Sequence, residues 1–202
     1  MKLYFYFIFI LFTFLYPKII KVSFNDDSRI SYKGSHPAHD WVGISDRIKG
    51  GLLCKDSSLD ECVIKIAIPL KSFDSNSSGR DSNMLIHTES NKYPFVKFIS
   101  DSFNMKSLYL EESEDIVKSD GESEVILTGS LEFHGVQKNI SINLQLSKKE
   151  DTFLGMSEFA ISLDDYNVEK PQLLLVPISD EIIISCKLFC NNEFYFSKYE
   201  KK

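Results

Sequence analysis

The densest group of side chains capable of chemistry is a six-residue stretch near the start of the chain, His36-Pro37-Ala38-His39-Asp40-Trp41. Two imidazoles and a carboxylate so close together are groups that bind metal ions and that take part in hydrolysis. The proline between the histidines argues against a helix that would bring both rings to one face. We therefore favour a loop whose histidines and tryptophan cap one end of the fold. A metal-dependent enzyme or hydrolase using His36, His39 and Asp40 is the alternative.

A further histidine, His134, lies on the polar phase of an expected strand, opposite Leu131 and Phe133. We expect it to face solvent or a polar opening, and a hydrolase built around it is a second form of the enzyme alternative. No Gly-x-Ser-x-Gly, phosphate-binding glycine loop or His-Glu-x-x-His accompanies it in the sequence. With only 4 histidines in the chain, we expect no catalytic residue, no cofactor and no bound metal.

The chain has 4 cysteines, in two pairs. Cys54 and Cys62 flank the polar segment 55–61, which is typical of a hairpin loop, and we predict a disulfide between them. Cys186 and Cys190 share one face of an expected strand, so they lie ~13 Å apart, too far to bond to each other. Neither pair has the two-residue spacing of zinc motifs.

Two charged segments have structural explanations. Arg80 and Asp81 follow a serine- and glycine-rich stretch, so we expect Asp81 to cap a short helix over residues 81–89 and Arg80 to hold a nearby carbonyl or carboxylate. The acidic stretch 111–124 lacks the ordered ligand spacing of a calcium loop, and we interpret it as a solvated loop or hairpin tip.

The elements that must position these residues are mainly strands. Apolar residues alternate with polar ones, as in Asn139 to Leu146, where Ile140, Ile142, Leu144 and Leu146 share one face. This period of two indicates half-buried antiparallel strands, about eight to ten of them. So many strands in one domain need closure or stacking to protect their edges, as a barrel or a sandwich. Periodicity alone does not choose between the two.

Composition and the amino terminus set the class and the compartment. The 202 residues include 29 Asp and Glu against 23 Lys and Arg, and no basic run is present, so nucleic acid is excluded as a partner. After Met1 and Lys2, an apolar run from Leu3 to Tyr16 predicts a signal peptide over residues 1–21, with an uncleaved anchor as the alternative. We expect cleavage between Tyr16 and Asn25, one domain over residues 22–202, and a periplasmic or secreted protein.

Three segments together resemble the YceI-like family of bacterial periplasmic proteins. They are Gly79-Arg80-Asp81 through Tyr93-Pro94-Phe95-Val96-Lys97-Phe98, then Leu127-Thr128-Gly129-Ser130-Leu131-Glu132-Phe133-His134-Gly135-Val136-Gln137-Lys138, and Asp180-Glu181-Ile182-Ile183-Ile184. The resemblance implies an all-β fold, a lipocalin-like eight-stranded antiparallel β-barrel with a short helix around an apolar tunnel. It also implies non-catalytic binding, and transport or storage, of an amphiphilic lipid of polyisoprenoid or fatty-acyl type. Transient membrane contact and a homodimer are open expectations, and so is a structural module whose core is filled.

The apolar phases of the strands supply candidate walls for the tunnel, of which we expect about half to contact ligand. They are Ile66, Ile68, Val96, Phe98, Leu131, Phe133, Ile142, Leu144, Phe159, Ile161 and Ile184. Phe98 and Leu131 are the strongest candidates, because each lies inside a segment that resembles the family. Strand phase forces none of His36, His39 and His134 into this lumen, so replacing the three together by asparagine should leave bound lipid largely intact.

Overall fold

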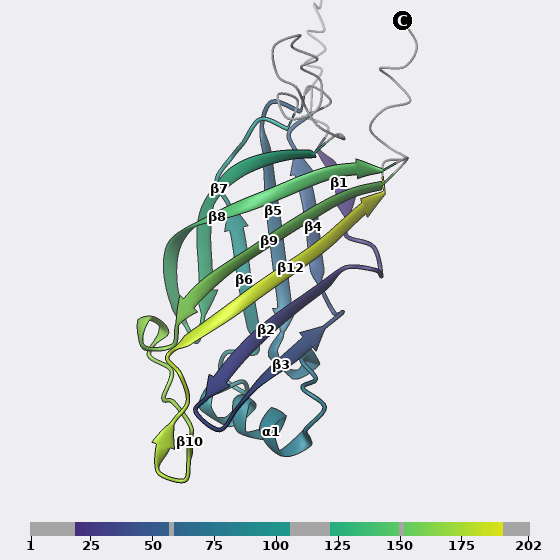
Figure 1. Cartoon of the computed structure of the whole chain (residues 1–202). Coiled ribbons are helices and arrows are strands. Elements are labelled where there is room, and N and C mark those ends of the chain that lie inside the picture. Colours follow the sequence, from purple (N-terminus) through teal and green to yellow (C-terminus); the bar gives the residue numbers. More distant parts are fainter. Residues whose placement is uncertain (1–18, 57–58, 106–121, 150–151, 192–202) are drawn as a thin grey trace, which may run out of the picture.

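The computed structural model describes residues 19–56, 59–105, 122–149 and 152–191. These residues form a ten-stranded antiparallel sheet in the order β1-β4-β5-β6-β7-β8-β9-β12-β2-β3, curled into a half-barrel (Figure 1). Its strands are β1 (Ile20–Ser23), β2 (Arg29–His36), β3 (His39–Ser45), β4 (Lys49–Cys54), β5 (Cys62–Pro69), β6 (Phe95–Ser100), β7 (Glu122–Phe133), β8 (Val136–Lys149), β9 (Thr152–Ser162) and β12 (Glu181–Asn191). The all-β antiparallel class is as predicted.

Smaller elements join these strands. A separate hairpin pairs β10 (Gln172–Leu173) with β11 (Val176–Pro177), and one α-helix, α1 (Ser78–His87), follows a 3-10 turn, η1 (Leu70–Ser72). A second 3-10 turn is η2 (Asp164–Tyr166). The main sheet has ten strands rather than the eight that the resemblance implies. One of them, β1, has only 4 residues, too few for alternation to mark it in the sequence.

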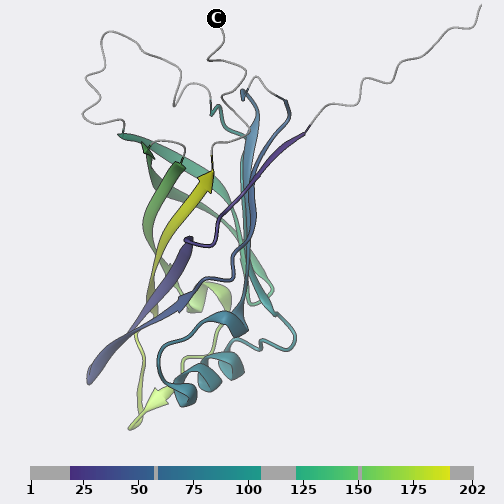
Figure 2. The same ribbon diagram turned by 90° about the vertical axis from the view of Figure 1, so that its right-hand side faces the viewer.

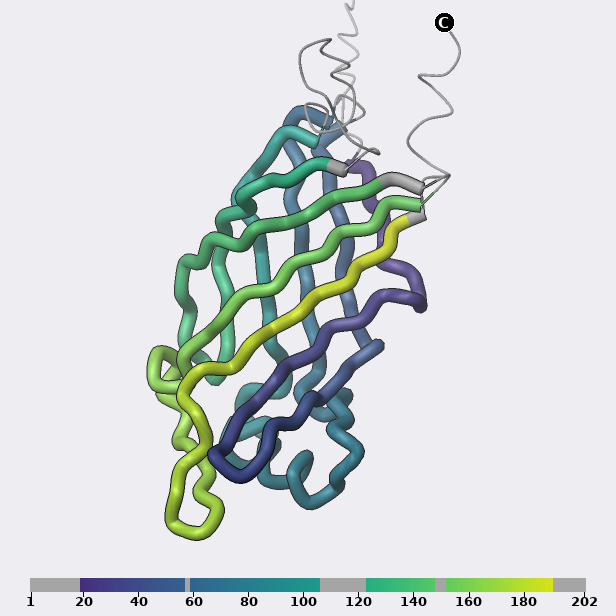
Figure 3. Tube along the Cα trace, in the orientation of Figure 1, coloured from purple at the N-terminus to yellow at the C-terminus, as the bar shows by residue number. Residues whose placement is uncertain are grey.

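Alternation in the long strands fixes which face is inside. On β8, Ile142, Leu144 and Leu146 are buried, whereas Asn143 and Gln145 between them are exposed. The inward residues of β5, β6, β7, β8 and β12 meet in one main apolar cluster on the concave side. The curled path of the chain around this cluster is clear in the tube view (Figure 3).

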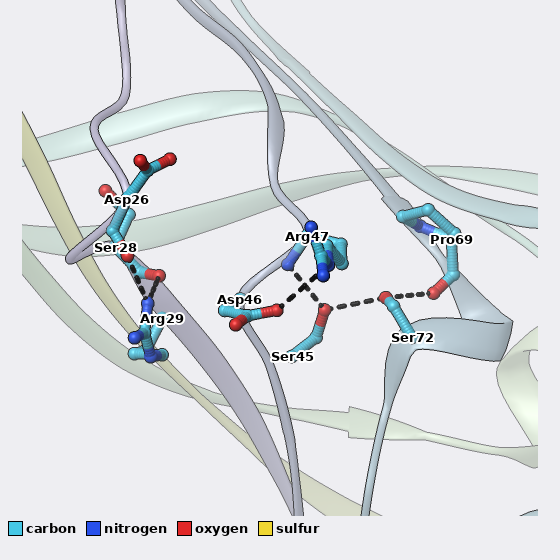
Figure 4. A network of polar contacts seen from close by, with 8 residues as sticks. All are labelled: Asp26, Ser28, Arg29, Ser45, Asp46, Arg47, Pro69 and Ser72. Atoms are coloured by element: carbon cyan, nitrogen blue, oxygen red, sulfur yellow. Dashed lines mark hydrogen bonds and ion pairs between the residues drawn. The ribbon is translucent and has the colours of Figure 1, made fainter.

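Polar contacts fasten the free edge of β3 to the segment after β5. Ile44 and Asp74 exchange two backbone hydrogen bonds of 2.9 Å. Beside this bridge the hydroxyl groups of Ser45 and Ser72 lie 2.7 Å apart, and Ser72 also donates to the carbonyl of Pro69 at 2.6 Å (Figure 4). These contacts satisfy part of an otherwise open edge and hold the β2–β3 hairpin against the barrel.

The opposite edge is held by the chain that links β1 to β2. After β1 pairs with β4, Phe24 forms an isolated bridge with Cys190 of β12, and the Asn25 N–H donates to the Phe189 carbonyl at 2.9 Å. The chain therefore passes within a few residues from β1, at one end of the sheet order, to β12, which lies near the other end. This crossing draws β1 and β12 together and closes that side of the half-barrel.

The helix α1 lies across one end of the half-barrel, below the strands in Figure 2. It begins at Ser78, three residues before the predicted start, and Ser77 is its N-cap. Asp81 is therefore not the cap, as predicted, but lies in the first turn, where its carboxylate accepts a hydrogen bond of 3.2 Å from the Ser75 N–H. Met84 and Leu85 pack against the main cluster, so the helix covers the end of the interior.

Some predicted features fall outside the described residues. Residues 1–18 of the predicted signal peptide are among them, and so is the acidic stretch 111–124 up to residue 121. Ile20 and Lys21 pair with Cys54 and Leu53 in the sheet, so cleavage after residue 21 would remove half of β1. In the part of the chain that the structure describes, no helix is both long and apolar enough to cross a bilayer.

Candidate ligand-binding cavity

An apolar cavity of about 400 Å³ lies between the concave face of the sheet and α1. Its walls come from β2, β3, β5, β6, β7, β8, β9 and β12, and its end comes from α1 and the segment 163–178. The exposed members of the lining are His39, Gly79, Asn83, Gln172 and Leu173. All five belong to the β2–β3 turn, α1 or the β10–β11 hairpin, so the cavity opens at this end, which we call the mouth.

The structure brings almost all the predicted tunnel residues together. The members that line the cavity are Ile66, Ile68, Val96, Phe98, Leu131, Phe133, Ile142, Phe159, Ile161 and Ile184. They come from six strands between Cys62 and Asn191, and they meet because each lies on the concave phase of its strand. Their contact with a ligand stays a prediction.

Leu144 is the exception, because it does not line the cavity. It is buried with Leu127 and Leu146 in the half of the barrel that lies away from the mouth, which we call the filled half. A Cβ at Gly155 on β9 would lie 3.4 Å from Leu144 and 3.5 Å from Leu146, an ordinary contact distance, so these leucines pack over the backbone of the neighbouring strand. Ile64 of β5 belongs to the same cluster and does not line the cavity either, so the cavity occupies the other, hollow half.

Two aromatic rings on the β2–β3 hairpin form one wall of the hollow half. Tyr32 is paired with Gly43 and Trp41 with Gly34, and each ring lies over the glycine opposite it. A Cβ at either glycine would collide with the ring, so the two glycines are needed for this close approach. Burial, and next the Asp81 carboxylate, raise the pKa of Tyr32, so its hydroxyl stays neutral beside the cavity.

The expectation that strand phase forces none of these three histidines into the lumen is wrong for His36. His36 and His39 are paired across the two-residue turn of the β2–β3 hairpin, and both line the cavity at its mouth. His36 is 7% exposed, because it shares the inward phase of Ile30 and Tyr32 on β2. That phase is visible in the sequence as a period of two, and continued to the end of the strand it predicts that His36 faces inward.

The face of α1 that lines the cavity is also missing from the predicted set. Arg80, Asn83, Met84 and His87 all contribute to the lining, at spacings of three, four and seven residues from Arg80. This spacing is one face of a helix, so it too is readable from the sequence. Arg80 donates to the Ser75 carbonyl at 3.1 Å, as predicted, and its guanidinium carbon lies 5.4 Å from the centroid of the Trp41 ring.

His134 faces neither solvent nor the cavity mouth, in contrast to the prediction. Its side chain is 11% exposed, its Nδ1 lies 2.9 Å from the Tyr166 carbonyl oxygen, and its ring packs edge-on against Tyr93. It therefore joins the β7–β8 turn to η2. Among the described residues, no group of three or more His, Cys, Asp or Glu side chains is placed to hold a metal ion.

The cysteines lie in different environments. Cys54 and Cys62 are directly opposite each other on β4 and β5, and their sulfur atoms are bonded in the structure. Cys186 and Cys190 are free thiols on β12. Burial raises the pKa of both thiols to about 11, but only Cys186 lines the cavity, whereas Cys190 packs beside the disulfide.

Solved structures with the same fold come from several bacteria. A polyisoprenoid binding domain from Saccharophagus degradans, implicated in plant cell wall breakdown, has a TM-score of 0.66 and 16% identity over 84% of this chain and 97% of that chain. BcnA of Burkholderia cenocepacia has a TM-score of 0.63 and 14% identity over 80% and 95% of the two chains. A Campylobacter jejuni YceI protein has a TM-score of 0.51 and 17% identity over 71% and 80%.

The sequence comparisons give the family. No curated protein matches the chain significantly. The profile of the YceI-like domain matches residues 23–189, which run from the end of β1 almost to the end of β12. The match includes both walls of the cavity, α1 and the β10–β11 hairpin. The chain therefore belongs to the YceI-like family.

Proposed function

We propose that this protein binds an amphiphilic lipid, of polyisoprenoid or fatty-acyl type, in the cavity, and transports or stores it without catalysis. The observation that carries the proposal is a cavity of about 400 Å³ that is lined mainly by apolar side chains and opens at one end. This volume is within the usual range of small-molecule pockets, ~300–1,000 Å³. A flexible apolar chain there would gain roughly 25 cal/mol for each Å² of apolar surface removed from water.

Two further facts agree with this proposal. The Saccharophagus degradans domain of the same fold is described as polyisoprenoid binding. A disulfide such as that between Cys54 and Cys62 persists in an oxidising compartment, which agrees with the periplasmic or secreted location that we propose. Cleavage of the signal peptide before Ile20 would keep β1 whole, and amino-terminal sequencing of the exported protein tests this.

We also propose that the mouth makes transient contact with a membrane through the β10–β11 hairpin. The segment 171–178 contains no charged residue, and at its turn Leu174 and Leu175 are 84% and 91% exposed. Both leucines have positive φ angles, a backbone conformation that is unfavourable for bulky residues. Since Gln172 and Leu173 of the same hairpin line the cavity, an apolar turn in a bilayer would place the mouth at the lipid surface.

Flotation with phosphatidylcholine vesicles tests the membrane contact. Replacing Leu174 and Leu175 together by serine should reduce the vesicle-bound fraction several-fold. Ile126→Ser is the matched control, because Ile126 is 73% exposed on β7, outside the cavity lining. Equal flotation of the hairpin variant and the wild type would contradict the contact.

The alternatives have less support among the described residues. The enzyme alternatives depend on His36, His39, Asp40 and His134. Of these, His36 and His134 each use Nδ1 in a hydrogen bond or close polar contact that holds a turn in place, and the Asp40 carboxylate pairs with Lys33 at 2.9 Å. The filled-core alternative describes the half of the barrel around Leu127, Leu144 and Leu146, but not the half around the cavity.

Native mass spectrometry of freshly purified, exported protein tests the proposed function. We expect a bound species with the mass of an isoprenoid or fatty-acyl lipid, which organic extraction removes and added lipid restores. The same spectrum gives the oligomeric state. Protein that carries no lipid, and that takes up none after extraction, would contradict the proposal.

A further inference from the structure

The polar side chains of the cavity lining are gathered at the mouth. The β2–β3 turn contributes His36 and His39, and α1 contributes Arg80, Asn83 and His87. Both elements lie at the same end of the half-barrel (Figures 1 and 2). Among the described residues that line the cavity, Arg80 is the one permanent charge, and none is an aspartate or glutamate. The end of the cavity is therefore rich in hydrogen-bond donors, and its one permanently charged lining residue is a cation.

His36 presents a hydrogen-bond donor that has no acceptor in the described part of the chain. The Ala38 N–H donates to its Nδ1 at 3.1 Å, so Nδ1 carries a lone pair. In the neutral imidazole the proton is then on Nε2. That Nε2 is buried, in a residue that lines the cavity, and has no partner among the described residues. A buried donor is costly to leave unpaired, so an acceptor from a bound molecule would stabilise it.

Arg80 supplies a positive charge at the same mouth. One of its nitrogens, Nη1, donates to the Ser75 carbonyl and hydroxyl at 3.1 and 3.2 Å, which leaves other N–H groups of the guanidinium for a ligand. Its guanidinium is stacked near Trp41, and the Trp41 and His39 rings are neighbours with centroids 5.7 Å apart. No carboxylate within the described residues forms an ion pair with Arg80. Asp81, the acid beside it, accepts from the Ser75 N–H instead.

We propose that the mouth binds the anionic oxygen head group, a carboxylate or a phosphate, of the lipid whose chain fills the cavity. His36 Nε2–H and Arg80 donate to its oxygen atoms. A neutral acceptor such as an alcohol would pair with His36 but would leave the charge of Arg80 uncompensated. This inference rests on the proposed function and adds to it the class of head group.

Two pairs of probes test the inference, each with one chain and two head groups. They are laurate with dodecan-1-ol, and farnesyl phosphate with farnesol, measured by displacement of the neutral dye N-phenyl-1-naphthylamine from lipid-free protein. We expect the anionic member of at least one pair to bind about tenfold or more tightly than its alcohol, as charge-assisted hydrogen bonds would give. Preference within the laurate pair assigns a carboxylate, and preference within the farnesyl pair assigns a phosphate.

Variants then assign the preference to the mouth. Arg80→Gln and His36→Phe should each reduce the acid-to-alcohol ratio several-fold, Arg80→Lys should keep most of it, and Lys71→Gln, an exposed cation outside the lining, should leave it unchanged. Because Arg80 also contacts Ser75 and Trp41, replacing it changes the mouth as well as the charge. A measurement on the wild-type protein, which needs no substitution, therefore accompanies the variants. The carboxyl resonance of ¹³C-labelled laurate should titrate with a pKa below that of free laurate, because Arg80 favours the carboxylate.

Two results would count against the inference in different ways. Equal affinity for acid and alcohol in both pairs, or a raised pKa of bound laurate, would overturn the anionic head group and leave lipid binding intact. Failure of all four probes to displace the dye would instead contradict the proposed function.

Discussion

The filled and hollow halves of the barrel are built on the same strands, with the same alternation of apolar residues, but only the hollow half borders the cavity. On β8, Leu144 and Leu146 pack with Leu127 of β7 and over Gly155 of β9, and none of these residues lines the cavity. Ile142, two residues before Leu144, instead faces the cavity. Alternation thus decides that a side chain points inward, whereas its position along the barrel decides whether it borders the cavity.

The two halves also differ in how they are held at their ends. The filled half is next to the bonded Cys54 and Cys62 and their cluster with Val22, Leu59 and Met105. The hollow half ends in α1 and two hairpin turns with exposed residues. Close packing gives dispersion contacts that an open cavity lacks. We therefore expect the filled half to contribute more to stability and the hollow half to carry ligand binding, and the following variants test that division.

The largest expected effect is a charge placed in the hollow half. Leu131→Glu or Phe98→Arg should abolish lipid co-purification, because a buried charge loses its hydration and cannot pack against an apolar chain. Native mass spectrometry measures the lipid load, and circular dichroism checks the fold. Ile126→Glu and Ile99→Arg, exposed positions on the same two strands, are the controls and should keep the load.

An uncharged variant covers the case in which these buried charges unfold the protein. Val96→Phe adds bulk at a half-buried lining position and should lower the lipid load while the fold persists. A folded Leu131→Glu protein with the wild-type load would place the ligand outside this cavity.

Truncation should be more costly in the filled half than in the hollow half. Leu144→Ala removes a well-packed side chain and should lower the free energy of unfolding by about 2–5 kcal/mol. Ile161→Ala, at a partly buried lining position, enlarges a space that already exists and should cost only about 1 kcal/mol. Urea unfolding of lipid-free protein measures both values, and equal costs would refute the division between the halves.

The bond between Cys54 and Cys62 should affect stability but not lipid binding. Replacing both residues by alanine should lower the free energy of unfolding by roughly 2–3 kcal/mol, the cost of freeing a loop of this length. The lipid load should remain, because neither residue lines the cavity. Peptide mapping of exported protein that finds either residue bonded to Cys186 or Cys190 would instead show a different pairing.

The smallest expected effect uses the two free thiols as reporters of the two halves. With a pKa of about 11, each thiol is almost fully protonated at pH 8, so alkylation by iodoacetamide should be slow and should accelerate about tenfold per pH unit up to pH 11. Bound laurate should slow alkylation of Cys186 several-fold and leave Cys190 unchanged, since only Cys186 lines the cavity. Equal protection of both would mean that the ligand acts on the whole fold rather than on the hollow half.

Much of this protein is determined by the sequence alone, where a local rule applies. Strand phase is such a rule, and it identified Phe98, Leu131 and most of the other inward-facing residues because side chains alternate along any strand. The same rule predicts that His36 faces inward, because His36 continues the phase of Ile30 and Tyr32. The helical spacing of Arg80, Asn83 and His87 is a local signal of the same kind.

Only the tertiary structure decided which inward-facing residues border a cavity. Leu144 and Ile142 are indistinguishable by phase, yet only Ile142 lines the cavity. The mouth is a tertiary property too, since it needs a β2–β3 turn, α1 and the β10–β11 hairpin to converge at one end of the sheet. Alternation and helical spacing are properties of neighbouring residues, whereas the space between two walls depends on residues that the chain brings together only on folding.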